Sequence, residues 1–406
     1  MNKFKTLLSS KKTLLPAVLL FACISLFFVY NLSDKHRFGL ERKSPISTSS
    51  QFIKNTAQIE QLKMTKEQWE SCLNPGEEPS AYLSIVIVTR VDNYAGGQQH
   101  RLQNFIDSAY VLAEKTKTPI ELLIVEWNPP KDKRRVIDAF RFRASSYLNY
   151  RIITIPNSLH QIMQNRGGSP LHEFEGKNVG IRFARGEFVV CTNQDDIWSH
   201  NFHNAIISRV FKKGYIYLQH QDPHNIHDNL PPSIVNLEAF PSDETIYESC
   251  SLGEQNWGSY QLPPPITVTS KNDYEIQDKS TTMNILQVAD QAGDFTMAHR
   301  DTWKIPRGYR EAGGVAWMDI EFICTATWTK EIPVVYVRPG FTCHQEHSNI
   351  WESNKEAMND NTNIDMSKIE RKESVYMNKE GEWALMNYKI YEEGVSCVQF
   401  QGGLAL

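Results

Sequence analysis

The stretch GEFVVCTNQDDIWSHNF, residues 186–202, begins as an apolar run and ends in two adjacent acids. Short apolar runs rich in β-branched residues are typical of strands that are buried on both faces of a parallel sheet. Comparable runs lie upstream at residues 83–89, 120–127 and 151–156, and segments with helical character separate them. Strands that alternate with helices predict an α/β domain with a doubly wound sheet.

Polar residues follow these runs at the points where the strands end. In open α/β sheets, ligands bind at the carboxyl ends of the strands, so these residues are the first candidates for a site. An acid at the tip of a buried strand is costly unless a cation or hydrogen-bond donors compensate for its lost hydration. Asp195 and Asn193 lie two residues apart, on the same side of an extended chain, and could offer oxygen ligands to Mg or Mn. Asp195 and Asp196 could instead cap a helix that begins near Trp198.

The N-terminal residues predict a membrane anchor. Residues 13–30 are uncharged and mostly apolar, and a helix of this length nearly spans a hydrocarbon layer of ~30 Å. Lys3, Lys5, Lys11 and Lys12 precede this stretch and favour a cytoplasmic N-terminus. A cleaved signal peptide is the alternative. We expect a cytoplasmic tail at 1–12 and a transmembrane signal anchor at 13–30.

Beyond this anchor, the chain divides by composition. Residues 31–78 are polar and predict a stem, residues 79–350 carry the apolar runs and form the main domain, and residues 351–406 are a charged C-terminal extension. The whole chain of 406 residues is 41% hydrophobic, which is typical of a globular protein. Its formal net charge of -4 argues against a general nucleic-acid binder. The sequence does not reveal how the cysteines pair.

Residues 176–197, GKNVGIRFARGEFVVCTNQDDI, resemble the nucleotide-sugar-binding region of GT-A fold glycosyltransferases. In that family, a helix with an Asn and a basic residue leads through Ala-x-Gly into a strand that ends in a DxD-type motif. Asn178 and Arg182 match the helix, and Asp195 matches the last Asp of the motif. Asn193 stands where the motif usually has Asp, and it offers a neutral oxygen. The resemblance implies a Rossmann-like GT-A fold, a mixed sheet flanked by helices.

The same resemblance implies where the donor binds. Residues at the ends of the first two strands hold the nucleotide in the family, and uridine is the common base. The matching residues here are Thr89, Arg90, Asp92 and Glu126. We therefore expect a nucleotide-sugar donor that is UDP-linked, although Arg90 could instead pair with a neighbouring carboxylate.

Residues 293–322 resemble the acceptor half of inverting, family 2 type glycosyltransferases. Asp319 matches the acid that acts as catalytic base, with Glu321 as a near neighbour. An inverting transferase needs a carboxylate to take the proton from the acceptor hydroxyl. The alternative is that Asp319 is a solvated or capping acid of a helix.

A histidine late in the domain often completes the metal site of such enzymes. His344 is the first choice here and His347 the second, so the expected ligands of Mn or Mg are Asp195, Asn193 and His344. A zinc site is the alternative, but a convincing four-ligand spacing is missing.

The resemblance thus implies a glycosyltransferase that moves a sugar from a nucleotide-sugar to a hydroxyl of a glycan or glycoconjugate, with inversion. The predicted anchor places it in the Golgi membrane as a single-pass type II protein, with the endoplasmic reticulum as the other compartment. A retaining transferase of the same fold would not need Asp319 as a base. A carbohydrate-binding protein that has lost catalysis, and a nucleotidyltransferase that releases pyrophosphate, are further alternatives.

Overall fold

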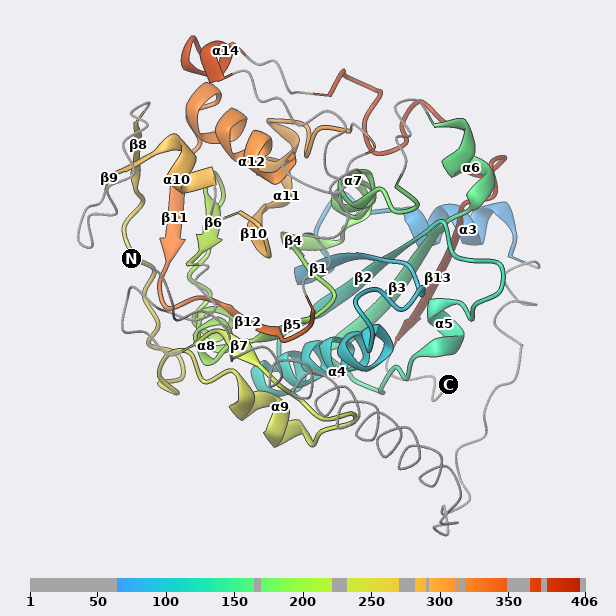
Figure 1. Cartoon of the computed structure of the whole chain (residues 1–406), viewed down its shortest axis with the longest axis horizontal. Helices are drawn as coiled ribbons and strands as arrows, with labels where there is room; N and C mark the ends of the chain where they lie inside the picture. Colours follow the sequence, from blue (N-terminus) through green and yellow to red (C-terminus); the bar gives the residue numbers. More distant parts are fainter. Residues whose placement is uncertain are drawn as a thin grey trace, which may run out of the picture. The chain divides into compact units, whose positions relative to one another are not determined.

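The computed structural model describes residues 64–163, 169–220, 232–269, 282–289, 292–311, 313, 318–348, 366–373 and 378–401. An eight-stranded sheet runs through these residues in the order β11-β6-β10-β4-β1-β2-β3-β13 (Figure 1). Its strands are β1 (Ala81–Thr89), β2 (Ile120–Trp127), β3 (Leu148–Ile155), β4 (Gly186–Thr192), β6 (Ile216–Gln219), β10 (Phe295–His299), β11 (Val334–Val337) and β13 (Ser396–Gln401). Five further strands form two small sheets: β5 (Asp196–Trp198), β7 (Ile234–Val235), β8 (Thr267–Thr269), β9 (Thr282–Asn284) and β12 (Thr342–Gln345).

The centre of the large sheet is parallel and its flanks are mixed. β4, β1, β2 and β3 run parallel, whereas β10 is antiparallel to both β4 and β6. Both faces are covered, since Val86 and Val88 of β1 join one hydrophobic core and Ile85 and Ile87 join the other. The predicted α/β sheet with flanking helices is therefore confirmed, and the sheet is mixed.

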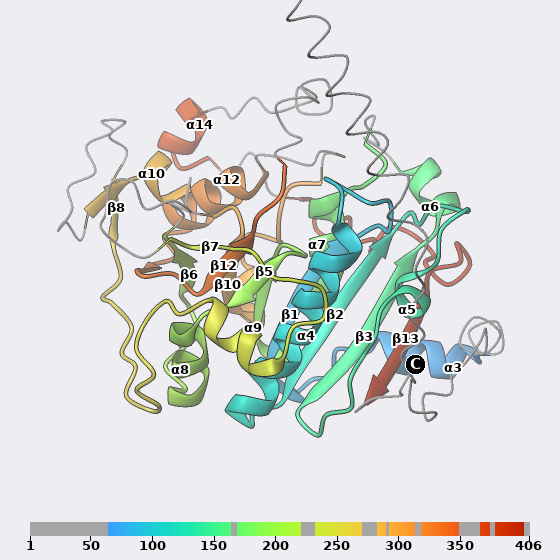
Figure 2. The same ribbon diagram turned by 60° about the horizontal axis from the view of Figure 1, so that its bottom comes forward.

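Helices cover the sheet on both faces (Figures 1 and 2). On one face lie α4 (Gln98–Thr116), α5 (Val136–Ala139), α8 (His200–Ser208) and α9 (Asp243–Ser249). On the other lie α7 (Glu173–Phe183), α10 (Ile285–Ala289), α11 (Arg300–Lys304) and α12 (Met318–Ile323), which continues as a π-helix (Cys324–Thr329). The remaining helices are α3 (Lys66–Leu73), α6 (Asn157–Ile162) and α14 (Met366–Glu370).

Helix α7 lies unusually close to β1 because glycines face the strand. A Cβ atom added at Gly176 would lie 2.6 Å from a methyl carbon of Val88, and one at Gly180 would clash with Val86. The close approach fixes the polar side of α7 next to the carboxyl end of β1, where the candidate site lies.

Two elements differ from the predicted domain boundaries. Helix α3 lies in the predicted stem, and β13 lies in the predicted C-terminal extension, yet β13 pairs with β3 as the edge strand of the large sheet. A disulfide between Cys72 and Cys397 joins them. The folded domain therefore includes residues from both of these segments.

The predicted membrane anchor at 13–30 lies outside the described residues, as do the tail and most of the stem. Among the residues that the structure does describe, no helix combines the length and the apolar character needed to cross a membrane.

Candidate active site

A buried acid and two histidines meet beyond the carboxyl end of β4. Asp195 is only 4% exposed. Its Oδ1 lies 3.5 Å from His344 Nε2, and its Oδ2 lies 3.2 Å from His347 Nε2. Arg101 Nε of α4 approaches the same Oδ2 at 3.4 Å. The structure therefore brings together Asp195 and His344, the predicted first choices, and adds His347, the second.

The small sheet sets this geometry. β5 begins directly after Asp195, and β12 carries His344; the two strands are antiparallel, with His344 opposite Asp196. The main-chain oxygen of Asp195 accepts hydrogen bonds from the Gln345 main-chain nitrogen at 3.0 Å and from its side-chain Nε2 at 3.2 Å. Strand pairing therefore fixes the main chain at Asp195 and at His344.

Charges around Asp195 keep it ionised. Burial opposes its ionisation, but the hydrogen bond from His347 and the electrostatic influence of His344, His347 and Arg101 hold its pKa below the ordinary value. In turn, the hydrogen bond to Asp195 raises the pKa of His347. The site therefore offers a carboxylate at neutral pH.

These side chains fit a divalent cation. One oxygen or nitrogen atom from each of Asp195, His344 and His347 lies within 4.8 Å of the others. Imidazole nitrogen is a ligand for transition metals, whereas Mg²⁺ prefers oxygen throughout. The set of donors therefore favours Mn²⁺ over Mg²⁺, and it is also compatible with a catalytic zinc.

The neighbours of Asp195, Asn193 and Asp196, make hydrogen bonds within the protein. Asn193 Nδ2 donates to Asp294 Oδ1 at 2.5 Å, and so the predicted metal ligand Asn193 is turned to an acid that the sequence analysis did not single out. Asp196 Oδ2 lies 2.5 Å from Thr192 Oγ1 and accepts a hydrogen bond from the Asn193 main-chain nitrogen at 3.2 Å. Helix α8 is capped by Ser199, so the alternative that the acid pair caps this helix is wrong.

The predicted catalytic base lies on the first turn of α12. Asp319 is half-buried, and burial raises its pKa to about 6. The charge of Lys177 opposes this rise. Lys177, on α7, is itself buried and lies 2.7 Å from Glu173 Oε1. Sequence reasoning missed Lys177, although it stands in the quoted helix, because it looked like any other polar residue there.

Glu321, the other predicted catalytic acid, is committed elsewhere. It is buried, and its Oε1 accepts from Arg310 Nη2 at 2.8 Å. Burial raises the pKa of Glu321 and Arg310 opposes this rise, but Arg310 engages both carboxylate oxygens, Oε2 through its Nε and Oε1 through its Nη2, so an acceptor hydroxyl would have to displace the guanidinium. The structure therefore leaves Asp319 as the candidate base.

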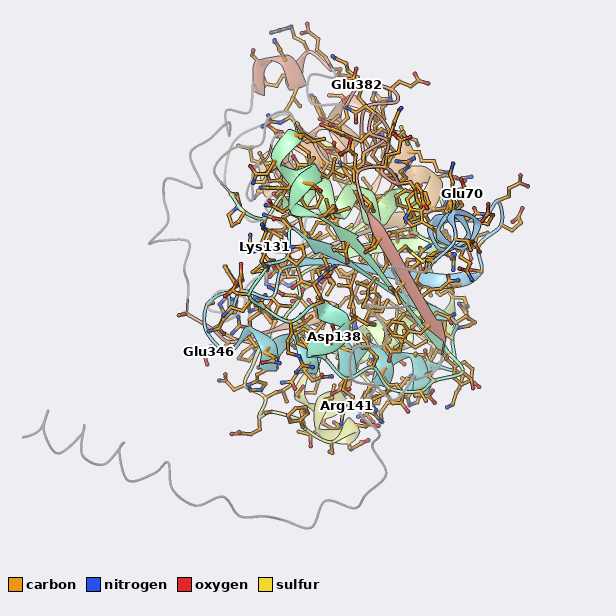
Figure 3. The ribbon with its side chains drawn as sticks, turned by 90° about the vertical axis from the view of Figure 1, so that its right-hand side faces the viewer. Glu70, Lys131, Asp138, Arg141, Glu346 and Glu382 are labelled. Atoms are coloured by element: carbon orange, nitrogen blue, oxygen red, sulfur yellow. A yellow bond between two sulfur atoms is a disulfide. The ribbon has the colours of Figure 1, made fainter. Side chains whose placement is uncertain are left out.

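A cavity of about 570 Å³ opens at the carboxyl ends of β1, β2 and β3. Its wall includes Arg90, Asn128, Lys131, His160 and Pro170. Lys131 at this cavity and Glu346, next to the histidine pair, lie on the same side of the molecule, opposite Glu70 of α3 (Figure 3). Of the predicted donor contacts, only Arg90 lines the cavity.

The other predicted donor contacts at the strand ends stabilise the framework. Thr89 Oγ1 donates to Gln194 Oε1 at 2.6 Å, and Asp92 Oδ2 lies 3.4 Å from Arg90 Nε. Glu126 is buried and accepts from Arg135 Nε at 2.8 Å. Glu126 does not line the cavity and its oxygens are engaged inside the protein, so its contact with the donor stays a prediction.

The two predicted residues of helix α7 are not among the residues that line the cavity. Asn178 Nδ2 donates to the main-chain oxygen of Tyr309 at 2.7 Å, and Arg182 Nη1 donates to that of Ala384 at 2.8 Å. Both side chains hold segments that pack on α7. Their role as donor contacts stays a prediction.

Comparison with known proteins gives similarity at the level of structure alone. No family model matches the chain, and no curated protein matches it. A structure of S. aureus TarS with UDP-GlcNAc matches with a TM-score of 0.37 at 12% identity, over 66% of this chain and 59% of that one. A mutant of Drosophila β1,4-galactosyltransferase 7 with manganese, UDP-Gal and xylobiose matches with a TM-score of 0.30 at 13% identity, over 72% of this chain and 80% of that one. GalNAc-T7 with UDP, GalNAc and Mn²⁺ matches with a TM-score of 0.35 at 10% identity, over 66% of this chain and 44% of that one.

The matching structures are GT-A fold glycosyltransferases, the class that the sequence resembles. This chain spans only 38% of another TarS structure. At TM-scores below 0.5 these similarities fix neither substrate nor reaction, which we infer from the side chains of the site.

Proposed function

We propose that the protein is a glycosyltransferase that uses a nucleotide-sugar donor and a divalent cation. The observation that carries this proposal is the buried Asp195 with His344 and His347 beyond the carboxyl end of β4, at the same rim of the sheet on which a cavity opens at the carboxyl ends of β1 to β3. A Mn²⁺ ion held by these three residues would neutralise the diphosphate of the donor as it leaves.

Other residues of the protein bind the nucleotide and accept the proton. The cavity beside Arg90 and Lys131 receives the nucleotide, and these two cations face its negative charge. Asp319 takes the proton from the acceptor hydroxyl. Its pKa of about 6 suits this task, because the carboxylate is largely ionised at neutral pH and still basic enough to accept a proton.

The use of Asp319 as a base favours inversion, since a retaining enzyme would not need it. UDP is the expected nucleotide, and the acceptor is a hydroxyl of a glycan or glycoconjugate. The apolar residues 13–30 would anchor the enzyme in the Golgi membrane, with the domain on the lumenal side.

The test is release of UDP from UDP-GlcNAc, UDP-galactose and UDP-glucose by the lumenal portion, with and without Mn²⁺. We expect release from at least one donor to need Mn²⁺ and to fall about 100-fold in Asp195→Asn. Asp301→Asn is the matched control, because Asp301 is an exposed acid paired with Lys213 and Lys304, and it should retain full activity.

Each other outcome contradicts the proposal in its own way. Pyrophosphate release would indicate a nucleotidyltransferase. Sugar binding without turnover of any donor would indicate a carbohydrate-binding protein. If Asp195→Asn turned over the donor at the wild-type rate and without Mn²⁺, Asp195 would have no role in the reaction.

A further inference from the structure

Asp294 is an acid of the site that the proposed reaction leaves without a role. It directly precedes β10, whose first residue Phe295 pairs with Thr192 at the carboxyl end of β4. Its Oδ1 accepts from Asn193 Nδ2 at 2.5 Å, and its main-chain oxygen accepts from Thr192 Oγ1 at 2.7 Å. Both its backbone and one carboxylate oxygen are therefore held in place.

The second carboxylate oxygen is available to a ligand. Among the described residues, no hydrogen bond or ion pair involves Asp294 Oδ2, and the side chain is half-buried rather than enclosed. A carboxylate that is fixed through one oxygen and open at the other is a pre-organised hydrogen-bond acceptor.

Asp294 lies near residues of both halves of the proposed reaction. His344 and Asp195 of the candidate metal site act electrostatically on it, and so do Lys177 and Glu173 of α7. Lys177 also acts on Asp319. In the proposed function, the transferred sugar must lie between the diphosphate near Asp195 and the base Asp319, and Asp294 is an acid that shares electrostatic neighbours with both.

We propose that Asp294 Oδ2 accepts a hydrogen bond from a hydroxyl of the donor's glycosyl group and thereby selects that sugar, with Asn193 as its positioning residue. This inference rests on the proposed function and adds a residue that determines donor specificity. It also explains why Asn stands at 193: an amide nitrogen can donate to Asp294, whereas an ionised Asp would repel it.

The structure favours a sugar over the metal as the partner of Asp294. Its oxygens are not part of the group of atoms within 4.8 Å of one another that Asp195, His344 and His347 form. A sugar hydroxyl is a hydrogen-bond donor, and a carboxyl oxygen without another partner can accept from it.

The test compares the binding of Mn²⁺, UDP, UDP-GlcNAc, UDP-galactose and UDP-glucose to the wild type and to Asp294→Asn by calorimetry, with the donors in the presence of Mn²⁺. We expect the Kd values for Mn²⁺ and for UDP to stay within about twofold, because the substituted side chain touches neither. The affinity for the preferred UDP-sugar relative to that for UDP should fall about tenfold. Asp294→Ala should show the same pattern more strongly.

Asn193→Ala provides a second line of test that leaves the acid in place. It should lower the same ratio by a smaller factor, because Asp294 is then no longer held, and it should leave Mn²⁺ binding unchanged. An unchanged ratio in both Asp294 variants would overturn the inference. A loss of Mn²⁺ affinity in these variants would make Asp294 a metal ligand and would equally overturn it. If the wild type binds neither UDP nor any UDP-sugar, the proposed function itself fails.

Discussion

Asp319 is the residue whose protonation the proposed reaction should report most directly. Burial raises its pKa to about 6, and only its ionised form can accept a proton. We therefore expect kcat/KM to rise about tenfold per pH unit below pH 6 and to level off above it. The rate of UDP release to acceptor, measured from pH 4.5 to 8, checks this.

Two variants separate Asp319 from its neighbour. Asp319→Asn should lower kcat by about 100-fold or more. Glu321→Gln should lower the melting temperature, because it breaks the buried pair with Arg310. It should leave the rise of kcat/KM with pH, which levels off near pH 6, unchanged. Full activity of Asp319→Asn would show that Asp319 is not the base. A pH profile of kcat/KM that shifts only in Glu321→Gln would indicate that Glu321 is the base instead.

At the scale of residues, the sequence could locate Asp195 because it follows an apolar strand and because residues 176–197 resemble the donor-binding region of GT-A glycosyltransferases. His344 followed from the same resemblance, which implies a metal ligand late in the domain. Asp294 and Lys177 carried no such signal: one precedes a short strand, and the other is a polar residue of a helix. Their importance arises from contacts with residues far away in the chain, which no local pattern encodes.

At the scale of elements, β12 is the strand on which the metal site depends. Cys343 precedes His344 and forms a buried disulfide with Cys250, which directly follows α9. This bond ties β12 to α9. We therefore expect removal of the disulfide to loosen the strand that carries His344.

The double variant Cys250→Ala/Cys343→Ala should weaken Mn²⁺ binding about tenfold. The control is Cys72→Ala/Cys397→Ala, which removes the disulfide between α3 and β13. Each loss should cost about 2–5 kcal/mol of stability, but the control should leave the Kd for Mn²⁺ unchanged. Calorimetry at a temperature where both variants are folded decides the matter, and equal Mn²⁺ affinity in the two would contradict the role given to β12.

The strands of the sheet centre were predictable, and its edges were not. The apolar runs at 83–89 and 120–127 match β1 and β2 closely, because strands buried on both faces must be apolar throughout. β13 and α3 lie at the margin of the domain, are short, and stand in polar surroundings. Their pairing and their disulfide, rather than their composition, attach them to the fold.

At the scale of the whole molecule, the sheet order creates the site. β10 enters antiparallel beside β4, and this brings Asp294 next to Asn193, 101 residues away in sequence. The small sheet brings His344 back to Asp195 in the same way. The sequence predicted the class of sheet and the rim on which ligands bind, but not these crossings, since they depend on strand order.

The central claim is that Asp195, His344 and His347 together hold the divalent cation. The most direct test is the electron spin echo spectrum of Mn²⁺ bound to the protein, which reports directly coordinated nitrogen. We predict modulation from two imidazole nitrogens in the wild type, from one in each of His344→Gln and His347→Gln, and a large loss of Mn²⁺ affinity in Asp195→Asn. Tight Mn²⁺ binding without nitrogen modulation, or binding that Asp195→Asn leaves intact, would contradict the account.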